Sequence, residues 1–178
     1  RAVNGAALSS EVAGIVEALS FQDGQDIAAG TPLLQLRAEE ELATLRQYQA
    51  AAENAQVTYD RDLKQLKAQG VSQATVDSDL ATLKQAQAQV AAQQALIDKK
   101  TVKAPFAGRL GVREVDLGQY LAAGTEMVTL QSLDPILFDF TLPQQALAKL
   151  KVGQPVAATL DGYPGESFAG TITAISPL

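Results

Sequence analysis

Two stretches of the chain, SEVAGIVEALSFQDGQDIAAGTPLLQL at residues 10–36 and APFAGRLGVREVDLGQYLAAGTEMVTL at residues 104–130, are copies of one pattern. They align without a gap at a constant offset of 94 residues and are identical at nine of 27 positions. A match of this regularity indicates an internal repeat, which has to be recognised before any other feature is interpreted. The identities include Gly24 with Gly118, Gly30 with Gly124, and Gly14 with Gly108.

Each copy has the pattern of short β-strands joined by tight turns. Its apolar residues fall in short runs, such as Leu33, Leu34 and Leu36, that are bounded by glycines. Turns need residues that tolerate a positive φ, so we assign a structural turn role to all six glycines of the repeat. Two half-motifs that are each too small to bury a face predict one β-sandwich over residues 5–37 and 101–131. Two unrelated β-hairpins are the alternative.

Residues 38–100, between the copies, have a helical composition rich in Ala, Gln, Glu, Leu and Lys. Gly70 is the only Gly or Pro in this segment, so we expect antiparallel helices at 38–69 and 73–100 with a tight turn between them. Heptad spacing predicts a coiled-coil hairpin about 45–48 Å long. The seam residues are Leu45, Ala52, Tyr59 and Leu66 on the first helix and Val76, Leu83, Val90 and Ile97 on the second, with Gln49, Gln56, Gln87 and Gln94 at weaker intervening positions.

Residues 132–178 have a third pattern, typical of part of a β-barrel. Apolar residues alternate over 136–142 and predict a half-buried strand. We further predict a short helix at 143–150, strands at 156–160 and 168–175, and a turn at 161–165. The fold class is therefore α+β and multi-domain. Because residue 1 is Arg and residues 172–178 read as a strand running into a turn, we also expect a longer parent protein.

Composition excludes several functional classes. A net charge of −6 argues against nucleic-acid binding, which needs clustered Lys and Arg. The chain has no His and no Cys, so the usual proton shuttle, the thiol nucleophile and most metal ligands are missing. The acidic run Glu39-Glu40-Glu41 is explained by the first turn of a helix, where negative charge is stabilising. We therefore predict no enzymatic activity, no metal and no cofactor.

Two motifs, VKAPFAGRLGVREVDLGQYLAAGTEMVTL (102–130) and LDPILFDFTLPQQALAKLKVGQPV (133–156), resemble the periplasmic adaptor family, also called membrane fusion proteins. Both are similar to adaptors that serve transporters of the resistance-nodulation-division (RND) class. The resemblance implies a lipoyl/biotinyl-like sandwich interrupted by the helical hairpin and followed by a partial β-barrel. It also implies a non-catalytic protein of the periplasm, attached to the inner membrane through a segment outside this chain. Such an adaptor links an RND transporter to a TolC-type outer-membrane channel for efflux of drugs or other small molecules.

The resemblance also implies where the partners bind. In this family the hairpin tip docks on the channel, the barrel sits on the transporter, and several copies form a ring, which we expect to be a hexamer in the assembled pump. Family tips often carry Arg, then Leu four residues on, then Ser seven further. Here Arg61 and Ser72 keep the outer spacing, while Gln65 occupies the Leu place beside Leu66. The expected channel contacts are Arg61, Leu66, Gln69, Gly70, Val71 and Ser72.

Other interpretations of the same residues stay open at this point. Arg61 could pair with Asp62 or Asp77, and Ser72 could cap the second helix. An adaptor for an ABC or major-facilitator exporter uses the same modules and is the alternative function. A carrier domain with a modified Lys is disfavoured, because helical residues replace the turn where that Lys would lie. A purely structural coiled coil is disfavoured by the interrupted repeat.

Overall fold

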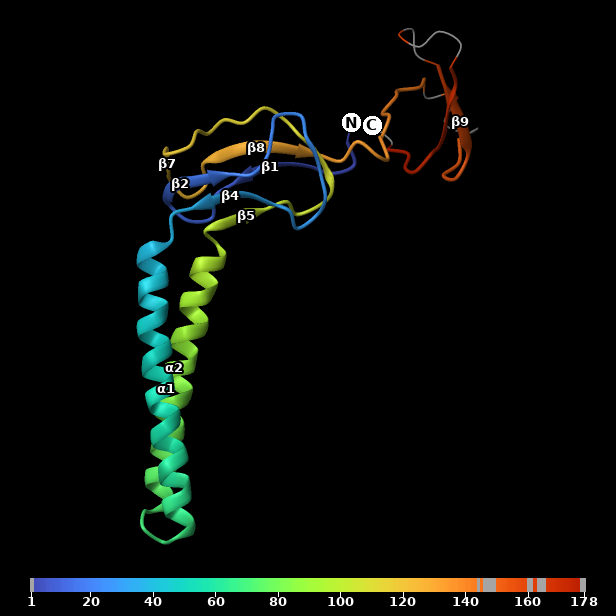
Figure 1. Cartoon of the computed structure of the whole chain (residues 1–178). Helices are drawn as coiled ribbons and strands as arrows, with labels where there is room; N and C mark the ends of the chain where they lie inside the picture. Colours follow the sequence, from blue (N-terminus) through green and yellow to red (C-terminus); the bar gives the residue numbers. More distant parts are fainter. Residues whose placement is uncertain (1, 144, 146–149, 160–161, 163–165, 177–178) are drawn as a thin grey trace. The chain divides into compact units, whose positions relative to one another are not determined.

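The computed structural model describes residues 2–143, 145, 150–159, 162 and 166–176 (Figure 1). The chain divides into two compact units, Arg1–Leu137 and Phe138–Leu178. The first unit contains two four-stranded sheets and two long helices, and the second contains a two-stranded sheet.

The two sheets of the first unit are antiparallel at every pairing between their strands. One sheet has the strand order β1-β8-β6-β3 and the other has the order β5-β4-β2-β7. The strands of the first sheet are β1 (Gly5–Ser9), β8 (Glu126–Gln131), β6 (Gly108–Leu110) and β3 (Asp26–Ile27). Those of the second are β5 (Thr101–Lys103), β4 (Pro32–Leu36), β2 (Gly14–Leu19) and β7 (Tyr120–Leu121).

The sequence repeat relates one sheet to the other. Adding 94 residues to β1, β2, β3 and β4 gives the positions of β5, β6, β7 and β8 in turn. Each sheet nevertheless takes two strands from each half of the chain, because β3 pairs with β6 and β7 pairs with β2. Backbone hydrogen bonds are exchanged in the same way: Val16 donates to the carbonyl of Gln119 at 2.9 Å, and Leu110 donates to that of Gln25 at 2.9 Å. Neither half can therefore complete a sheet alone.

One aliphatic core lies between these sheets and is built from both halves of the repeat. Full burial of each such side chain contributes roughly 1.5–3 kcal/mol. The largest fully buried side chains are Leu33, Leu34 and Leu36 from the first copy and Leu121, Met127 and Leu130 from the second.

Four glycines of the repeat have backbone conformations that disfavour other residues. Their φ angles are 73° at Gly24, 79° at Gly30, 81° at Gly118 and 83° at Gly124. A side chain in this left-handed region clashes with the backbone, which is why tight turns use glycine there.

The turn role assigned to Gly14 and Gly108 is wrong. Both residues begin strands, β2 and β6, and neither has a positive φ. Glycine is needed instead for close approach: a Cβ at Gly108 would lie 2.4 Å from the carbonyl oxygen of Gln131 on the neighbouring strand. A Cβ at Gly14 would lie 3.3 Å from the Cβ of Leu36.

The helices α1 (Glu39–Lys67) and α2 (Gln73–Asp98) run side by side and are joined by a short turn (Figure 1). Their bounds lie within three residues of the predicted ones, and α1 is about 43 Å long at 1.5 Å per residue. Neither helix has the length and hydropathy needed to cross a membrane.

Three of the four predicted intervening seam positions are wrong by one residue, because Gln49, Gln87 and Gln94 are exposed. Gln56 is half-buried, and its side chain donates to Asp60 on its own helix. The residue three positions after each main seam residue is buried or half-buried, except after Leu66 at the end of α1, because i and i+3 neighbours share this face. The seam on α1 consists of Glu41, Leu45, Tyr48, Ala52, Ala55, Tyr59, Asp62 and Leu66. Facing it are Val76, Asp79, Leu83, Ala86, Val90, Gln93 and Ile97 of α2, and Lys100 just beyond it.

The second unit contains the antiparallel strands β9 (Pro155–Ala158) and β10 (Phe168–Thr171), which are shorter than predicted. The predicted strand at 136–142 is wrong. Within that range Ile136 forms a single bridge with Ala2, and the rest is not strand. An alternating pattern favours a strand, but a strand forms only where the segment pairs with a neighbouring strand along its length. Most of the predicted helix at 143–150 and turn at 161–165 lies outside the described residues.

Candidate functional site

The candidate site is the helical hairpin, whose polar residues gather at three places along its length. These are the base, where the helices leave the sandwich; the distal seam, near the turn; and the tip itself, residues 69–72. Among the described residues, no His, Cys, Asp or Glu side chains group in a way that could hold a metal ion.

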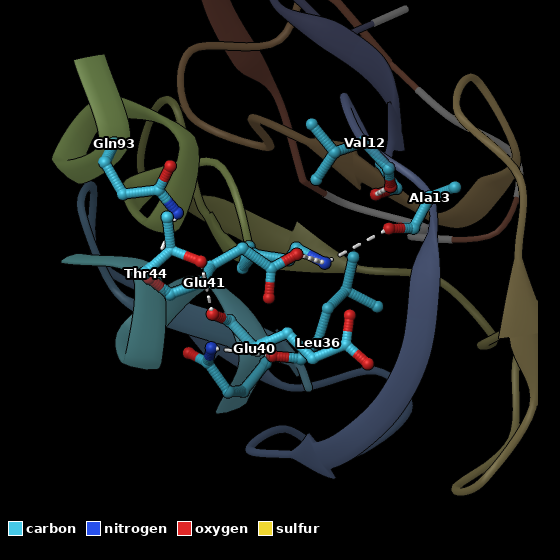
Figure 2. Close-up of polar contacts among 10 residues, drawn as sticks. Val12, Ala13, Leu36, Glu40, Glu41, Thr44 and Gln93 are labelled. Carbon is cyan, nitrogen blue, oxygen red and sulfur yellow. Dashed lines mark hydrogen bonds and ion pairs between the residues drawn. The ribbon is translucent and has the colours of Figure 1, made fainter. Parts of the chain in front are cut away.

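At the base, an ammonium group is buried between the hairpin and the sandwich. Lys100 is only 7% exposed, and its Nζ lies 2.7 Å from Oε1 of Glu41. The same Nζ donates to the carbonyl of Ala13, just before β2, at 3.4 Å. Figure 2 shows Glu41 between Ala13 and Gln93, whose Nε2 donates to the Glu41 carbonyl at 3.0 Å. These contacts join both helices to a sheet of the sandwich.

The electrostatics of the base follow from this geometry. The hydrogen bond from Lys100 holds the pKa of Glu41 below its ordinary value, against a smaller opposing effect of burial. Gly14 also contributes, because a Cβ there would lie 3.5 Å from the Lys100 Nζ. The sequence analysis missed this cluster, because it explained Glu41 only as a residue in the first turn of a helix. In the heptad register Glu41 lies four residues before Leu45, and Lys100 lies three residues after Ile97.

In the distal seam, Arg61 pairs with Asp62 and not with Asp77. Arg61 Nε lies 2.7 Å from Asp62 Oδ1, whereas Asp77 accepts from Gln73 Nε2 at 2.8 Å. Asp62 is 7% exposed, but the Arg61 side chain is 60% exposed. The hydrogen bond between them raises the pKa of Arg61 and lowers that of Asp62. The guanidinium is thus tethered at Nε while most of the side chain faces solvent.

At the tip, α1 ends in a Schellman motif whose left-handed residue is Gln69. The Gly70 N–H donates to the carbonyl of Gln65 and the Gln69 N–H to that of Leu66, both at 2.9 Å. Gln69 has φ 58°, although glycine is the usual residue at this position. Gly70, which the sequence suggests as the special turn residue, does not have a positive φ.

The second helix begins at a side-chain cap. Ser72 Oγ accepts from the Thr75 N–H at 3.2 Å, so the predicted capping role of Ser72 is confirmed. Gln69, Gly70 and Ser72 are exposed, whereas Val71 is half-buried.

The expected contact residues therefore fall into two groups. Gln69 to Ser72 form one continuous turn, and Arg61 lies eight residues before Gln69, about 12 Å back along α1. Leu66 is half-buried in the seam and supports the turn more than it exposes an apolar surface.

The chain matches a family model described as "RND MFP, barrel-sandwich hybrid domain" over residues 4–131. A second model, described as "CusB-like, beta-barrel domain", matches residues 138–178. The first match covers both sheets and the whole hairpin. The chain belongs to the family of RND membrane fusion proteins (MFP).

Among curated relatives, an uncharacterised protein of Haemophilus influenzae is 36% identical over 173 residues, covering 97% of this chain and 45% of its own length. The multidrug efflux pump subunit AcrA of Escherichia coli is 33% identical over 181 residues, covering 92% of this chain and 45% of its own length. The chain thus spans less than half the length of either relative. A solved structure of a MacA-MexA chimera carrying the Pseudomonas aeruginosa MexA α-hairpin has a TM-score of 0.83 at 18% identity. That match covers 99% of this chain and 65% of the chimera, and it shows a shared fold.

Proposed function

We propose that this protein is a non-catalytic periplasmic adaptor of an RND efflux pump. It links an inner-membrane RND transporter to a TolC-type outer-membrane channel, and the pumped compounds are drugs or other small molecules. The protein is held at the inner membrane through a segment outside this chain. Several copies form a ring, a hexamer in the assembled pump.

The proposal divides the chain into three working parts. Residues 5–37 and 101–131 form a lipoyl-like sandwich, residues 38–100 form a coiled-coil hairpin, and residues 132–178 form part of a β-barrel. The seam supports the coiled-coil assignment, since its residues recur at heptad positions on both helices. The base contacts of Lys100 support a hairpin that transmits force to the sandwich.

The observation that carries the proposal is the exposed polar turn at the end of the paired helices, in a member of the RND membrane fusion proteins. Gln69, Gly70 and Ser72 are solvent-exposed, and their backbone is held by the Schellman motif and the Ser72 cap. A held, exposed turn is organised before binding, and this lowers the entropic cost of docking on a channel. The exposed guanidinium of Arg61 adds a cation beside it.

Reversing the charge at Arg61 tests the proposed contact. We expect Arg61→Glu in the full-length protein to weaken capture of the TolC-type channel about tenfold, because the substitution removes the contacting cation and reverses the charge at that position. Drug tolerance should fall in a strain that depends on this adaptor. Arg46→Glu, an exposed position nearer the base of the same helix, is the matched control and should leave both unchanged. Unchanged channel capture and drug tolerance in the Arg61 variant, with its circular dichroism spectrum intact, would remove Arg61 from the contact.

A further inference from the structure

Two layers of the hairpin seam contain charged residues on both helices. Glu41 faces Lys100 at the base, and Asp62 faces Asp79 near the tip. Asp62 lies 21 residues after Glu41, and Asp79 lies 21 residues before Lys100, so both pairs belong to one antiparallel heptad register. The base layer joins opposite charges, whereas the distal layer brings two carboxyl groups together. The proposed adaptor function makes no use of this second pair.

The acidic pair lies at the seam between the two helices. Asp62 is buried and Asp79 is half-buried, and the Oδ2 atom of Asp79 is itself buried without a hydrogen-bond donor among the described residues. From α1, the charged groups that face Asp79 are Asp62 and Arg61, and Arg61 already donates to Asp62. A buried carboxylate oxygen without a donor is costly, and a second carboxylate opposite increases that cost.

One proton on the pair removes the repulsion between the two carboxylates and supplies a hydrogen-bond donor between them. Two carboxylates are acceptors only, but a protonated carboxyl group donates an O–H to its ionised neighbour. Arg61 determines which group stays ionised, because its hydrogen bond lowers the pKa of Asp62. The pKa of Asp79 is raised, first by desolvation and then by the hydrogen bond and charge of Asp62. When the pair holds one proton, that proton therefore resides on Asp79 and is shared with Asp62.

We propose that Asp62 and Asp79 form a proton-binding layer in the seam, which makes the stability of the distal hairpin depend on pH. When Asp79 is protonated, the layer is hydrogen-bonded across the helices. When Asp79 ionises, the layer becomes repulsive, and Arg61 is attracted by two carboxylates in place of one. The protonation state of the pair thus sets how firmly the helices are joined near the tip.

The direction of the pH dependence follows from the two opposite shifts. A carboxyl group whose folded pKa is raised takes stability away as pH climbs from its unfolded pKa, about 4, through the folded value. Asp79 thus makes the distal hairpin less stable toward neutral pH. Asp62, whose pKa is lowered, contributes stability that is lost only as pH falls below about 4 through its folded value.

The experiment is made on the 178-residue chain alone, so its result does not depend on whether the protein binds a channel. The carboxyl carbons of Asp62 and Asp79 are titrated by NMR, and amide hydrogen exchange of residues 55–66 and 76–86 is measured from pH 4 to pH 8 after correction for intrinsic exchange rates. We expect Asp79 to titrate above the usual range for aspartate and Asp62 below it. Protection of the distal helices should fall as Asp79 ionises.

Two variants make the result specific. Asp79→Asn keeps the shape and supplies a permanent N–H donor to Asp62, so protection at pH 7 should rise at least about threefold and lose its dependence on Asp79 ionisation. Asp77→Asn, an exposed position on the same helix, should behave as the parent chain. An ordinary pKa for Asp79, or the same pH profile of protection in the parent and Asp79→Asn chains, would overturn the proposal.

Discussion

Replacing Gly108 with alanine should lower the free energy of unfolding of the sandwich by about 3 kcal/mol or more. The same replacement at Gly5 or Gly14 should lower it by less. The new Cβ would lie 2.4 Å from the carbonyl oxygen and 2.8 Å from the carbonyl carbon of Gln131. Both are backbone atoms of β8, which also pairs with β1, so no rotamer change can relieve the overlap. The expected result is a large drop in the midpoint of chemical unfolding, or no folded protein at the growth temperature.

Gly5→Ala is the matched control for this prediction. Gly5 also begins a strand, and a Cβ there would meet nothing within 4 Å. The same added methyl group should therefore change stability by less than about 0.5 kcal/mol. Gly14→Ala should fall between the two, because its nearest neighbour is the side chain of Leu36 at 3.3 Å. Equal stability of the Gly108 and Gly5 variants would show that β6 does not approach β8 as described.

Replacing Lys100 with methionine should loosen the base of the hairpin at a cost of about 2 kcal/mol. The substitution keeps most of the stem volume but leaves the Glu41 carboxylate without its cation. Loss of one partner of a fully buried ion pair costs about 3–5 kcal/mol, and the value here is smaller because the Glu41 side chain is 21% exposed. Thermal unfolding measures the cost, and hydrogen exchange in the first turn of α1 locates it.

The neighbouring residue provides the control for Lys100. Lys99 lies 3.5 Å from Glu11 in an exposed pair, so Lys99→Met should cost almost nothing. The Lys100 contribution should also depend on pH. Since the folded pKa of Glu41 is lowered, the stability it contributes is present above the ordinary glutamate pKa and is lost as pH falls through the folded value. A Lys100→Met chain as stable as the Lys99→Met chain at pH 7 would contradict a role for this pair in holding the hairpin.

The sequence repeat was sufficient to predict the two-copy strand pattern of the sandwich, because turn glycines and aliphatic runs recur at one offset. It could not reveal that each half gives strands to both sheets. The crossing strands β3 and β7 have two residues each, which is too short to show a period. Nor could the sequence distinguish Gly24, which needs a positive φ, from Gly108, which needs an empty Cβ position. Both residues are glycine, and only the backbone conformation and the neighbouring strand show why glycine is required at each position.

The main apolar positions of the hairpin were predictable, but its polar seam was not. Leu45, Val76 and Leu83 are all buried where the heptad pattern indicates. The i+3 positions mix apolar residues such as Tyr48 and Ala86 with charged residues such as Asp62, so they form no uniform apolar stripe that a local pattern could identify. Burial of Asp62 and Lys100 depends on partners from the other helix or the sandwich, which no local pattern specifies.

The alternation at 136–142 shows the opposite failure. Its period of two is clear, yet within 136–142 the structure assigns strand-type pairing only to Ile136, in its bridge with Ala2. A strand forms only where a neighbouring strand pairs along the segment. A local sequence pattern indicates which structure a segment can form, and pairing with a neighbouring strand determines whether it forms.

The central claim, that residues 69–72 meet an outer-membrane channel, is tested most directly by photocrosslinking in living cell envelopes. A photoreactive residue is placed at Gln69 or Ser72 of the full-length protein, with Gln47, an exposed position nearer the base of α1, as the control. Captured partners are identified by mass spectrometry. The account predicts a TolC-type channel from positions 69 and 72 and none from position 47. Recovery of only further copies of the adaptor, or of a soluble enzyme, from the tip positions would contradict it.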